Sequence, residues 1–152
     1  MLFTGQSEQT IDAKGRLAIP SRFRAQWNAE IHGPVWYCIP WPSGHLRIYT
    51  QNVFEALSAT YANSLTPGED AAEIEAQLFG WAEGIAPDTE VRLTLPKRHL
   101  ELIALPKDVM VVGVRNRIEV HPLESWKLKA PESFRRLPEK IARIEETNRH
   151  KP

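Results

Sequence analysis

The strongest constraint on the fold is an internal repeat. The nine residues DAKGRLAIP, from Asp12 to Pro20, return as DTEVRLTLP from Asp88 to Pro96. Apolar residues also correspond between the copies: Phe3, Leu46, Ile48 and Phe54 match Phe79, Ile118, Val120 and Trp126. Self-similarity of this kind is typical of a small structural unit that is used more than once. The sequence therefore predicts two copies of one module.

Each copy is predicted to contain a β-hairpin, a short helix and a second hairpin. In the first copy, strands over 7–12 and 16–19 flank a turn in which Asp12 accepts hydrogen bonds and Gly15 takes a positive φ. Pro20 ends the second strand, Ser21 can cap, and a short helix then runs to about Ala29. The closing hairpin is predicted over 35–39 and 46–49, with its counterpart over 109–112 and 117–121.

The segment between the copies follows helical periodicity on both sides of Thr66-Pro67-Gly68, which predicts a helical hairpin. Beyond Trp126 the chain is charged and has few apolar residues, so we expect a marginal helix or a frayed end that folding does not need. The predicted division is a first module over 6–53, a helical linker over 54–81, a second module over 82–125 and a charged C-terminal tail over 126–152.

Positive charge is local along this chain. Nineteen basic and nineteen acidic residues give a net charge of zero. Residues 51–100 carry three basic and eight acidic side chains, whereas the segments on either side carry a basic excess. This balance argues against a basic sheath around nucleic acid but allows short basic clusters that meet phosphates.

Cysteine usage and hydropathy indicate the cytoplasm. Cys38 is the only cysteine, so no internal disulfide can form. The N-terminal residues have neither a basic start nor an apolar run, and no stretch reaches membrane-spanning length. We therefore expect a cytoplasmic protein without a membrane partner.

Four basic side chains are expected to gather around the first turn. Lys14 and Arg16 flank Gly15, and Arg22 and Arg24 follow on the short helix. A two-stranded ribbon can enter the major groove of DNA, where Lys and Arg contact phosphates and Arg grips a guanine edge with two hydrogen bonds. Gly15 would permit close approach of the backbone. The alternative is that these are ordinary solvated charges on a hairpin.

The motif from Asp12 to Pro20, with a second Asp-x-x-x-Arg at Asp88 and Arg92, resembles the MraZ family of transcription factors. The resemblance covers residues 1 to about 126 and includes VVGVRNRIEV from Val111, followed by Trp126. It implies an α+β fold of two tandem swapped-hairpin modules of the SpoVT-AbrB type, joined and flanked by short helices. It also implies a nucleoid-associated, ring-shaped homo-oligomer that represses the division and cell-wall gene cluster by binding short direct repeats of double-stranded promoter DNA.

By that resemblance, the arginines of both motifs, Arg16 and Arg92, face DNA. Lys97 and Arg98 keep the second turn basic. We interpret Asp12 and Asp88 as turn-forming residues, because a carboxylate would repel a nearby phosphate.

The second turn departs from the family pattern, because Glu90 and Val91 replace Lys14 and Gly15. Glutamate reverses a charge at the tip, and a β-branched valine is a poor occupant of a positive-φ position. The second turn must therefore either differ in geometry or carry strain. This departure leaves a second interpretation open, an oligomeric protein-interaction or assembly module whose DNA face has decayed.

No catalytic, metal or cofactor site is predicted, so we do not expect an enzyme or a small-molecule substrate. The histidines at positions 32, 45, 99, 121 and 150 lack paired metal-ligand spacing with Cys38 or with one another. No acid/base or nucleophile constellation appears. Cys38, Trp36 and Trp41 are interpreted as structural residues, although the tryptophans could stack on single-stranded bases.

Overall fold

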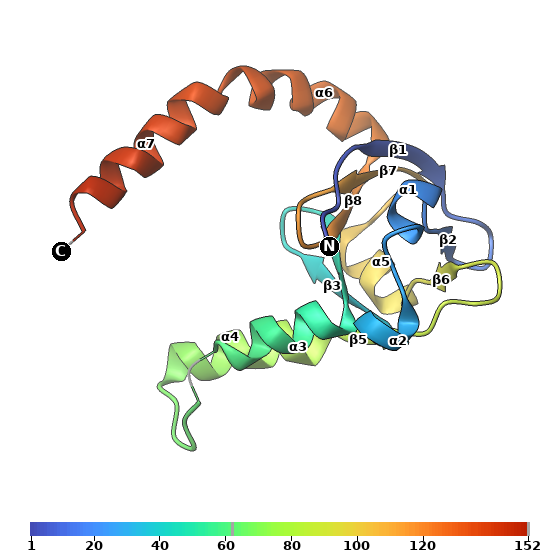
Figure 1. Cartoon of the computed structure of the whole chain (residues 1–152), viewed down its shortest axis with the longest axis horizontal. Helices are drawn as coiled ribbons and strands as arrows, with labels where there is room; N and C mark the ends of the chain where they lie inside the picture. The colour runs from blue at the N-terminus through green and yellow to red at the C-terminus, as the bar shows by residue number, and fades with distance from the viewer. Residues whose placement is uncertain (62, 152) are drawn as a thin grey trace.

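A six-stranded antiparallel sheet, a two-stranded sheet and seven helices form the part of the chain that the computed structural model describes, residues 1–61 and 63–151 (Figure 1). This arrangement confirms the predicted α+β class. The first copy contains β1 (Gln6–Thr10), β2 (Arg16–Ala18), α1 (Ser21–Arg24), α2 (Ala29–His32), β3 (Trp36–Trp41) and β4 (His45–Thr50). The second contains β5 (Glu83–Ile85), β6 (Arg92–Thr94), α5 (Lys97–Ile103), β7 (Asp108–Gly113) and β8 (Ile118–Pro122). Helices α3 (Gln51–Ala59) and α4 (Glu69–Trp81) lie between the copies, and α6 (Leu123–Arg135) and α7 (Leu137–Arg149) follow them.

The two sequence copies are interleaved in space. The strand order of the large sheet is β1-β7-β8-β4-β3-β5. The first strand of each copy therefore pairs with the other copy's closing hairpin, β1 with β7 and β5 with β3. The two closing hairpins meet where β4 pairs with β8, and β2 pairs with β6 in the separate two-stranded sheet. Because every sheet contact of β1, β2, β5 and β6 crosses between copies, the hydrophobic core belongs to both. The predicted pairing of strands 7–12 and 16–19 in one hairpin is therefore wrong: the turn between them forms, but β1 and β2 belong to different sheets.

The core forms from the side chains that point inward from these strands. Leu17 and Leu93 lie opposite each other in the β2–β6 pair, and both are buried. Phe3, Phe23 and Trp36 are fully buried and contact one another through Phe3, whose ring centroid lies 5.8 Å from that of Phe23 and 6.0 Å from that of Trp36. Aromatic residues contribute large apolar areas, which suits the short strands of this fold.

The helix predicted from Ser21 to Ala29 is divided in two. Asn28 has an extended backbone, and its side chain accepts a hydrogen bond from the Glu30 amide at 2.9 Å. An asparagine in this conformation caps a new helix. The first helical turn therefore ends at Arg24, and α2 begins at Ala29.

The predicted helices between the copies are found as α3 and α4, but α3 ends at Ala59, before Tyr61 and Leu65 of the same periodic pattern. Phe79 on α4 packs against α3 and the residues that follow it. Its ring centroid lies 6.0 Å from that of Phe54 and 6.0 Å from that of Tyr61. In the described part of the chain, no helix is long and apolar enough to cross a membrane.

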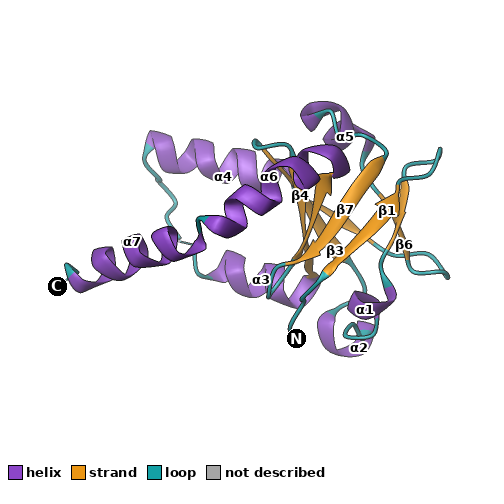
Figure 2. Ribbon diagram, turned by 90° about the horizontal axis from the view of Figure 1, so that it is seen from above, coloured by secondary structure: helices purple, strands orange, loops and turns teal. Residues whose placement is uncertain are grey.

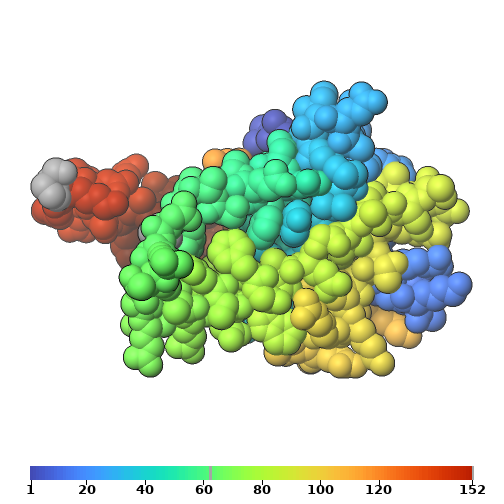
Figure 3. All heavy atoms as spheres, turned by 90° about the horizontal axis from the view of Figure 1, so that it is seen from below, coloured from blue at the N-terminus to red at the C-terminus, as the bar shows by residue number. Residues whose placement is uncertain are grey.

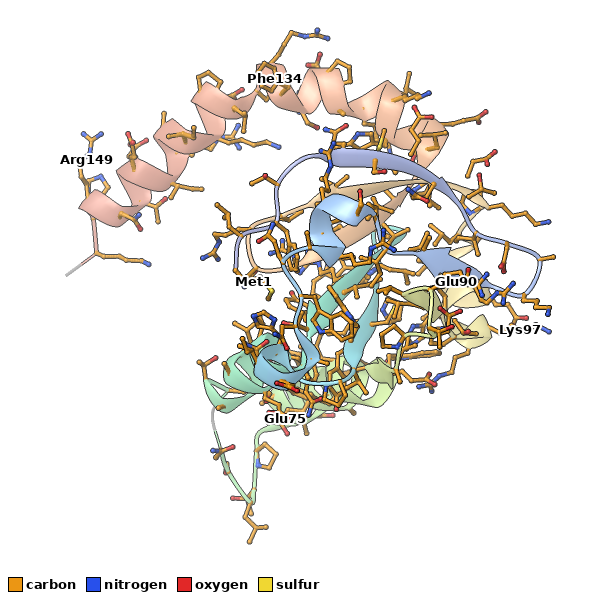
Figure 4. All side chains as sticks on the ribbon, turned by 45° about the vertical axis from the view of Figure 1, so that its right-hand side comes forward. Met1, Glu75, Glu90, Lys97, Phe134 and Arg149 are labelled. Atoms are coloured by element: carbon orange, nitrogen blue, oxygen red, sulfur yellow. The ribbon has the colours of Figure 1, made fainter. Side chains whose placement is uncertain are left out.

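The C-terminal tail takes the helical alternative throughout α6 and α7. These two helices form an arm, residues 123–149, that leads away from the sheets (Figures 1 and 2). Ion pairs one turn apart support it, such as Arg143 to Glu139 at 2.8 Å. Its large apolar side chains from Leu128 onward remain exposed, as the labelled Phe134 shows in Figure 4.

Candidate nucleic-acid interface

The first turn is held together by one carboxylate. Asp12 Oδ1 accepts hydrogen bonds from the backbone amides of Lys14 and Arg16, at 2.9 and 2.8 Å, and Oδ2 accepts from Arg16 Nε at 2.7 Å. The Arg16 amide has the largest effect among these groups in holding the pKa of Asp12 below its usual value. Gly15 has a φ of 78°, as the turn requires. The predicted turn-forming geometry of Asp12 and Gly15 is therefore observed, and Asp12 also fixes the Arg16 side chain.

The second turn repeats this geometry atom for atom. Asp88 Oδ1 accepts from the amides of Glu90 and Arg92, each at 2.9 Å, and Oδ2 accepts from Arg92 Nε at 2.8 Å. Val91 has a φ of 56°, in the left-handed region where a β-branched residue is strained. Of the two alternatives for this turn, the structure therefore shows unchanged geometry with strain. Val91 offsets part of that cost by packing against the hydrophobic core.

The two arginines lie on one face of a two-stranded ribbon. In the β2–β6 pair, Arg92 is directly opposite Ala18, and Arg16 is two positions from Ala18 along the same strand. Side chains alternate along a strand, so Arg16 and Arg92 share the face opposite to the buried Leu17 and Leu93. This outer face thus carries one aspartate-bound arginine from each copy.

Both turns project from the same end of the molecule. Figures 1 and 2 show the two loops together, away from the α6–α7 arm, and Figure 3 shows their blue and yellow-green atoms opposite to the red tail. The strands run antiparallel, so each turn lies against the other copy: the Leu95 amide donates to the Gly15 carbonyl at 2.8 Å, and the Ile19 amide donates to the Val91 carbonyl at 3.1 Å.

The expectation that four basic residues gather at the first turn needs correction. Helix α1 follows the end of β2 that lies beside the second turn, because Ile19 pairs with Val91 there. Arg22 lies over Gly5, so close that a side chain on Gly5 would collide with its guanidinium. Arg22 and Arg24 are therefore separated from Lys14 by the length of β2.

Arg98 is also held away from the second turn. Its Nε lies 3.3 Å from Glu83 Oε2, and its guanidinium lies 5.4 Å from the ring centroid of Trp81. Lys97 begins α5, beside the Leu95 that pairs with Gly15, so it accompanies the first turn and not the second. Because β2 and β6 run antiparallel, the residues that follow β6 lie beside the first turn, and the residues that follow β2 lie beside the second turn. The spacing of the sequence does not indicate this arrangement.

One cluster of histidine and glutamate side chains is not indicated by the spacing of the histidines in the sequence. His45 on β4 and His121 on β8 stack at 4.4 Å between ring centroids, and with Glu119 they bring three potential ligand atoms within 4.8 Å of one another. The register that places β4 beside β8 brings them together, which sequence spacing alone does not reveal. Two arginines donate hydrogen bonds to this cluster: Arg47 Nε donates to His45 Nε2 at 3.3 Å, and Arg117 Nε donates to Glu119 Oε2 at 2.8 Å.

Protonation within the cluster follows from these contacts. Burial, followed by the neighbouring His121, lowers the pKa of His45 to about 4 despite the opposing Glu119 carboxylate. Burial alone would raise the pKa of Glu119, but hydrogen bonds from His121 and Arg117 outweigh it and hold that pKa at about 2. A neutral His45 and an ionised Glu119 therefore form a polar network where the two copies meet, and the nearby guanidinium groups disfavour a further cation.

The other singled-out residues have structural surroundings. Trp36 and Cys38 are fully buried, and burial raises the pKa of the Cys38 thiol, which keeps it protonated. Trp41 carries the Arg47 guanidinium 3.7 Å from its ring centroid.

Comparison with known proteins assigns the chain to a family. A family model described as "MraZ protein, putative antitoxin-like" matches residues 2–73 and 78–140. The chain belongs to the MraZ family. The "Transcriptional regulator MraZ" of Legionella pneumophila (strain Corby) is 32% identical over 128 residues, covering 84% of each chain. The MraZ regulators of Photorhabdus laumondii and Pseudomonas savastanoi pv. phaseolicola are each 30% identical, over 127 and 125 residues that span 82% of this chain.

These comparisons confirm the resemblance that was based on the two Asp-x-x-x-Arg motifs. MraZ is a family of transcriptional regulators and not of enzymes, as the sequence predicted. Both matched segments contain one of the motifs, so each arginine of the outer ribbon face lies within the family match.

Proposed function

We propose that this MraZ-family protein is a sequence-specific DNA-binding transcriptional repressor of the division and cell-wall gene cluster. It binds short direct repeats of double-stranded promoter DNA as a cytoplasmic, nucleoid-associated oligomer, without a cofactor or a small-molecule substrate. The observation that carries the proposal is the pair Arg16 and Arg92 on the outer face of the β2–β6 ribbon, each fixed by an aspartate. Their roles, and those of Lys14, Arg22, Arg24 and Arg98, belong to this proposal.

Fixing the arginines prepares them for base recognition. Asp12 binds Arg16 through Nε at 2.7 Å, which leaves the two terminal amino groups of the guanidinium directed to other partners. No further hydrogen bond to these groups is found among residues 1–61 and 63–151. An arginine held in this way loses less conformational freedom on binding, and its planar fork matches the O6 and N7 atoms of guanine.

The interleaved topology supports the SpoVT-AbrB module type. Each copy exchanges its first strand with the other copy's closing hairpin, as a swapped-hairpin fold would require. In this proposal the first module spans 6–53, the linker 54–81, the second module 82–125 and the tail 126–152.

The exposed apolar residues of the arm favour the proposed self-association into a ring. Leu137, Ile141 and Ile144 recur at helical spacing along α7, and each exposes about half of its side chain or more. Soluble proteins rarely leave such an apolar stripe in water without a partner. A neighbouring copy would cover this stripe, and the basic arm suits the acidic surface of α4, which carries Glu69, Asp70, Glu73 and Glu75.

Equilibrium binding to the protein's own upstream promoter tests the function. Fluorescence anisotropy would compare a labelled promoter duplex, a shuffled duplex of equal length and the promoter's single strands over a range of salt concentrations. We expect the promoter duplex to bind most tightly and its affinity to fall steeply with salt. Equal affinity for the shuffled duplex, or a preference for single strands, would contradict sequence-specific repression.

A second candidate is the assembly module without DNA binding, which Glu90 and the zero net charge favour. A protein with this function would form an oligomer that does not bind the promoter duplex. Size-exclusion chromatography with light scattering, with and without the duplex, separates the two.

A further inference from the structure

The first turn and the second copy together line a single groove. Its lining includes Asp12, Lys14 and Gly15 from the first copy, and Glu83, Lys97 and Lys107 from the second, around an open volume of about 690 Å³. We propose that Lys14, Lys97 and Lys107 form a composite phosphate site for the DNA backbone. The second copy thus contributes to DNA binding mainly through two lysines that lie beside the first turn. This inference rests on the proposed DNA-binding function.

Backbone hydrogen bonds fix the lysines around the turn. The Leu95 amide donates to the Gly15 carbonyl at 2.8 Å, which places Pro96 and Lys97 against the first turn. On the other side, the Ile11 amide donates to the Lys107 carbonyl at 2.9 Å, one residue before Asp12. Two separate segments of the second copy therefore flank the first turn, and neither position depends on a flexible side-chain contact.

The acidic residues of the groove are already neutralised. Asp12 is paired with Arg16 at 2.7 Å, and Glu83 with Arg98 at 3.3 Å. Lys97 reaches Glu101 only at 3.8 Å, with 89% of its side chain exposed, where an ion pair contributes little. Lys14 and Lys107 form no ion pair with any residue in the part of the chain that the structure describes. The groove therefore retains the surplus positive charge that a phosphate requires.

Two of the three lysine positions of this site are not basic at the second turn. In the repeat, Pro20-Ser21 corresponds to Pro96-Lys97, so an uncharged serine occupies the position of Lys97. Lys14 is replaced by Glu90, whose carboxylate lies 3.5 Å from Arg92 Nη1. Glu90 and Lys97 are labelled in Figure 4 and lie on the same side of the molecule, so one face presents both an acidic and a basic turn.

The test is a charge-removal experiment with matched controls. Lys97→Ala/Lys107→Ala would be compared with Lys129→Ala/Lys140→Ala, which removes two arm lysines that form no ion pair in the described part of the chain. Light scattering would verify that both variants keep the wild-type oligomer. Anisotropy titrations with the promoter duplex would give the affinity and its logarithmic salt slope. If each lysine contacts one phosphate, the slope should become shallower by about 1.8 for each engaged copy, and the arm control should keep it. Lys97→Arg/Lys107→Arg should retain most of the slope.

Arg16→Ala, measured in parallel, separates the inference from the function on which it rests. All four replaced lysines are exposed, so unchanged thermal midpoints would verify folding. If Lys97→Ala/Lys107→Ala behaves like the arm control while Arg16→Ala loses affinity, the composite site is wrong and the DNA-binding function stands. If wild-type protein does not prefer the promoter duplex at all, the proposed function itself fails.

Discussion

Val91 occupies in the second turn the left-handed conformation that Gly15 occupies in the first, with φ values of 56° and 78°. The hydrogen bonds that Asp88 and Asp12 accept are the same in both turns. A non-glycine residue pays about 1 to 2 kcal/mol for this conformation. The structure maintains it because the strand pairing and the aspartate bonds fix the turn, and because the Val91 side chain packs on the core.

Gly15→Ala should therefore destabilise the protein by about 1 to 2 kcal/mol through backbone strain alone. A Cβ at this position would meet only the Leu95 carbonyl oxygen, at an ordinary distance of 3.7 Å, so no steric clash adds to the cost. Urea denaturation measures the effect. Gly68→Ala is the control, because Gly68 has a negative φ and no atom within reach of an added Cβ. Equal stability of the two variants would show that the first turn adapts without strain.

Glu90→Lys should tighten binding to the promoter duplex, because it changes the tip by two charge units. The log–log salt slope should steepen by about 0.9 for each engaged copy if the new lysine reaches one phosphate. Since Val91 already has the geometry of Gly15, Glu90→Lys/Val91→Gly should gain little beyond the single substitution. Unchanged affinity and slope in both variants would mean that the second turn faces away from DNA and that Arg92 serves to bind Asp88.

Acid should destabilise the fold partly through His45. Its folded pKa is about 4, against an ordinary value of 6.5, so the unfolded chain binds a proton in this range before the folded protein does. The free energy of unfolding should be unaffected by this residue above pH 6.5 and should fall between pH 6.5 and 4, by up to about 3 kcal/mol. His45→Gln should reduce this slope in urea denaturation measured across the range. His150→Gln, at an exposed position, should leave it unchanged.

Removal of the arm should separate assembly from folding. Few apolar residues of the arm are buried, so a chain ending at Lys129 should keep nearly the same thermal midpoint. The proposed self-association predicts that the oligomer becomes smaller in light scattering, and that Ile141→Asp/Ile144→Asp has the same effect in the full chain. An oligomer of unchanged size in both variants would assign assembly to another surface.

Local sequence patterns predict much of the fold. The repeated Asp-x-x-x-Arg motif predicts both turns, and helical periodicity predicts the two helices between the copies. What local patterns omit is which strand pairs with which. The pairing of β2 with β6 moves Lys97 to the first turn, and the pairing of β4 with β8 joins His45 to His121. The prediction that Arg22 lies at the first turn is wrong for the same reason, since the position of α1 depends on contacts between residues that are distant in the sequence.

The most direct test compares Arg16→Ala with Arg92→Ala in promoter binding. Both arginines are fixed by an aspartate on the same ribbon face, but only Arg92 also lies beside a glutamate. Removal of a base-reading arginine should cost about 1 to 3 kcal/mol per contact, and every engaged subunit multiplies the loss. Anisotropy titration of the wild-type, Arg16→Ala and Arg92→Ala proteins at one salt concentration provides the measurement. We expect a large loss of affinity for Arg16→Ala and a clearly smaller one for Arg92→Ala, whereas wild-type affinity in Arg16→Ala would contradict DNA recognition by the outer ribbon face.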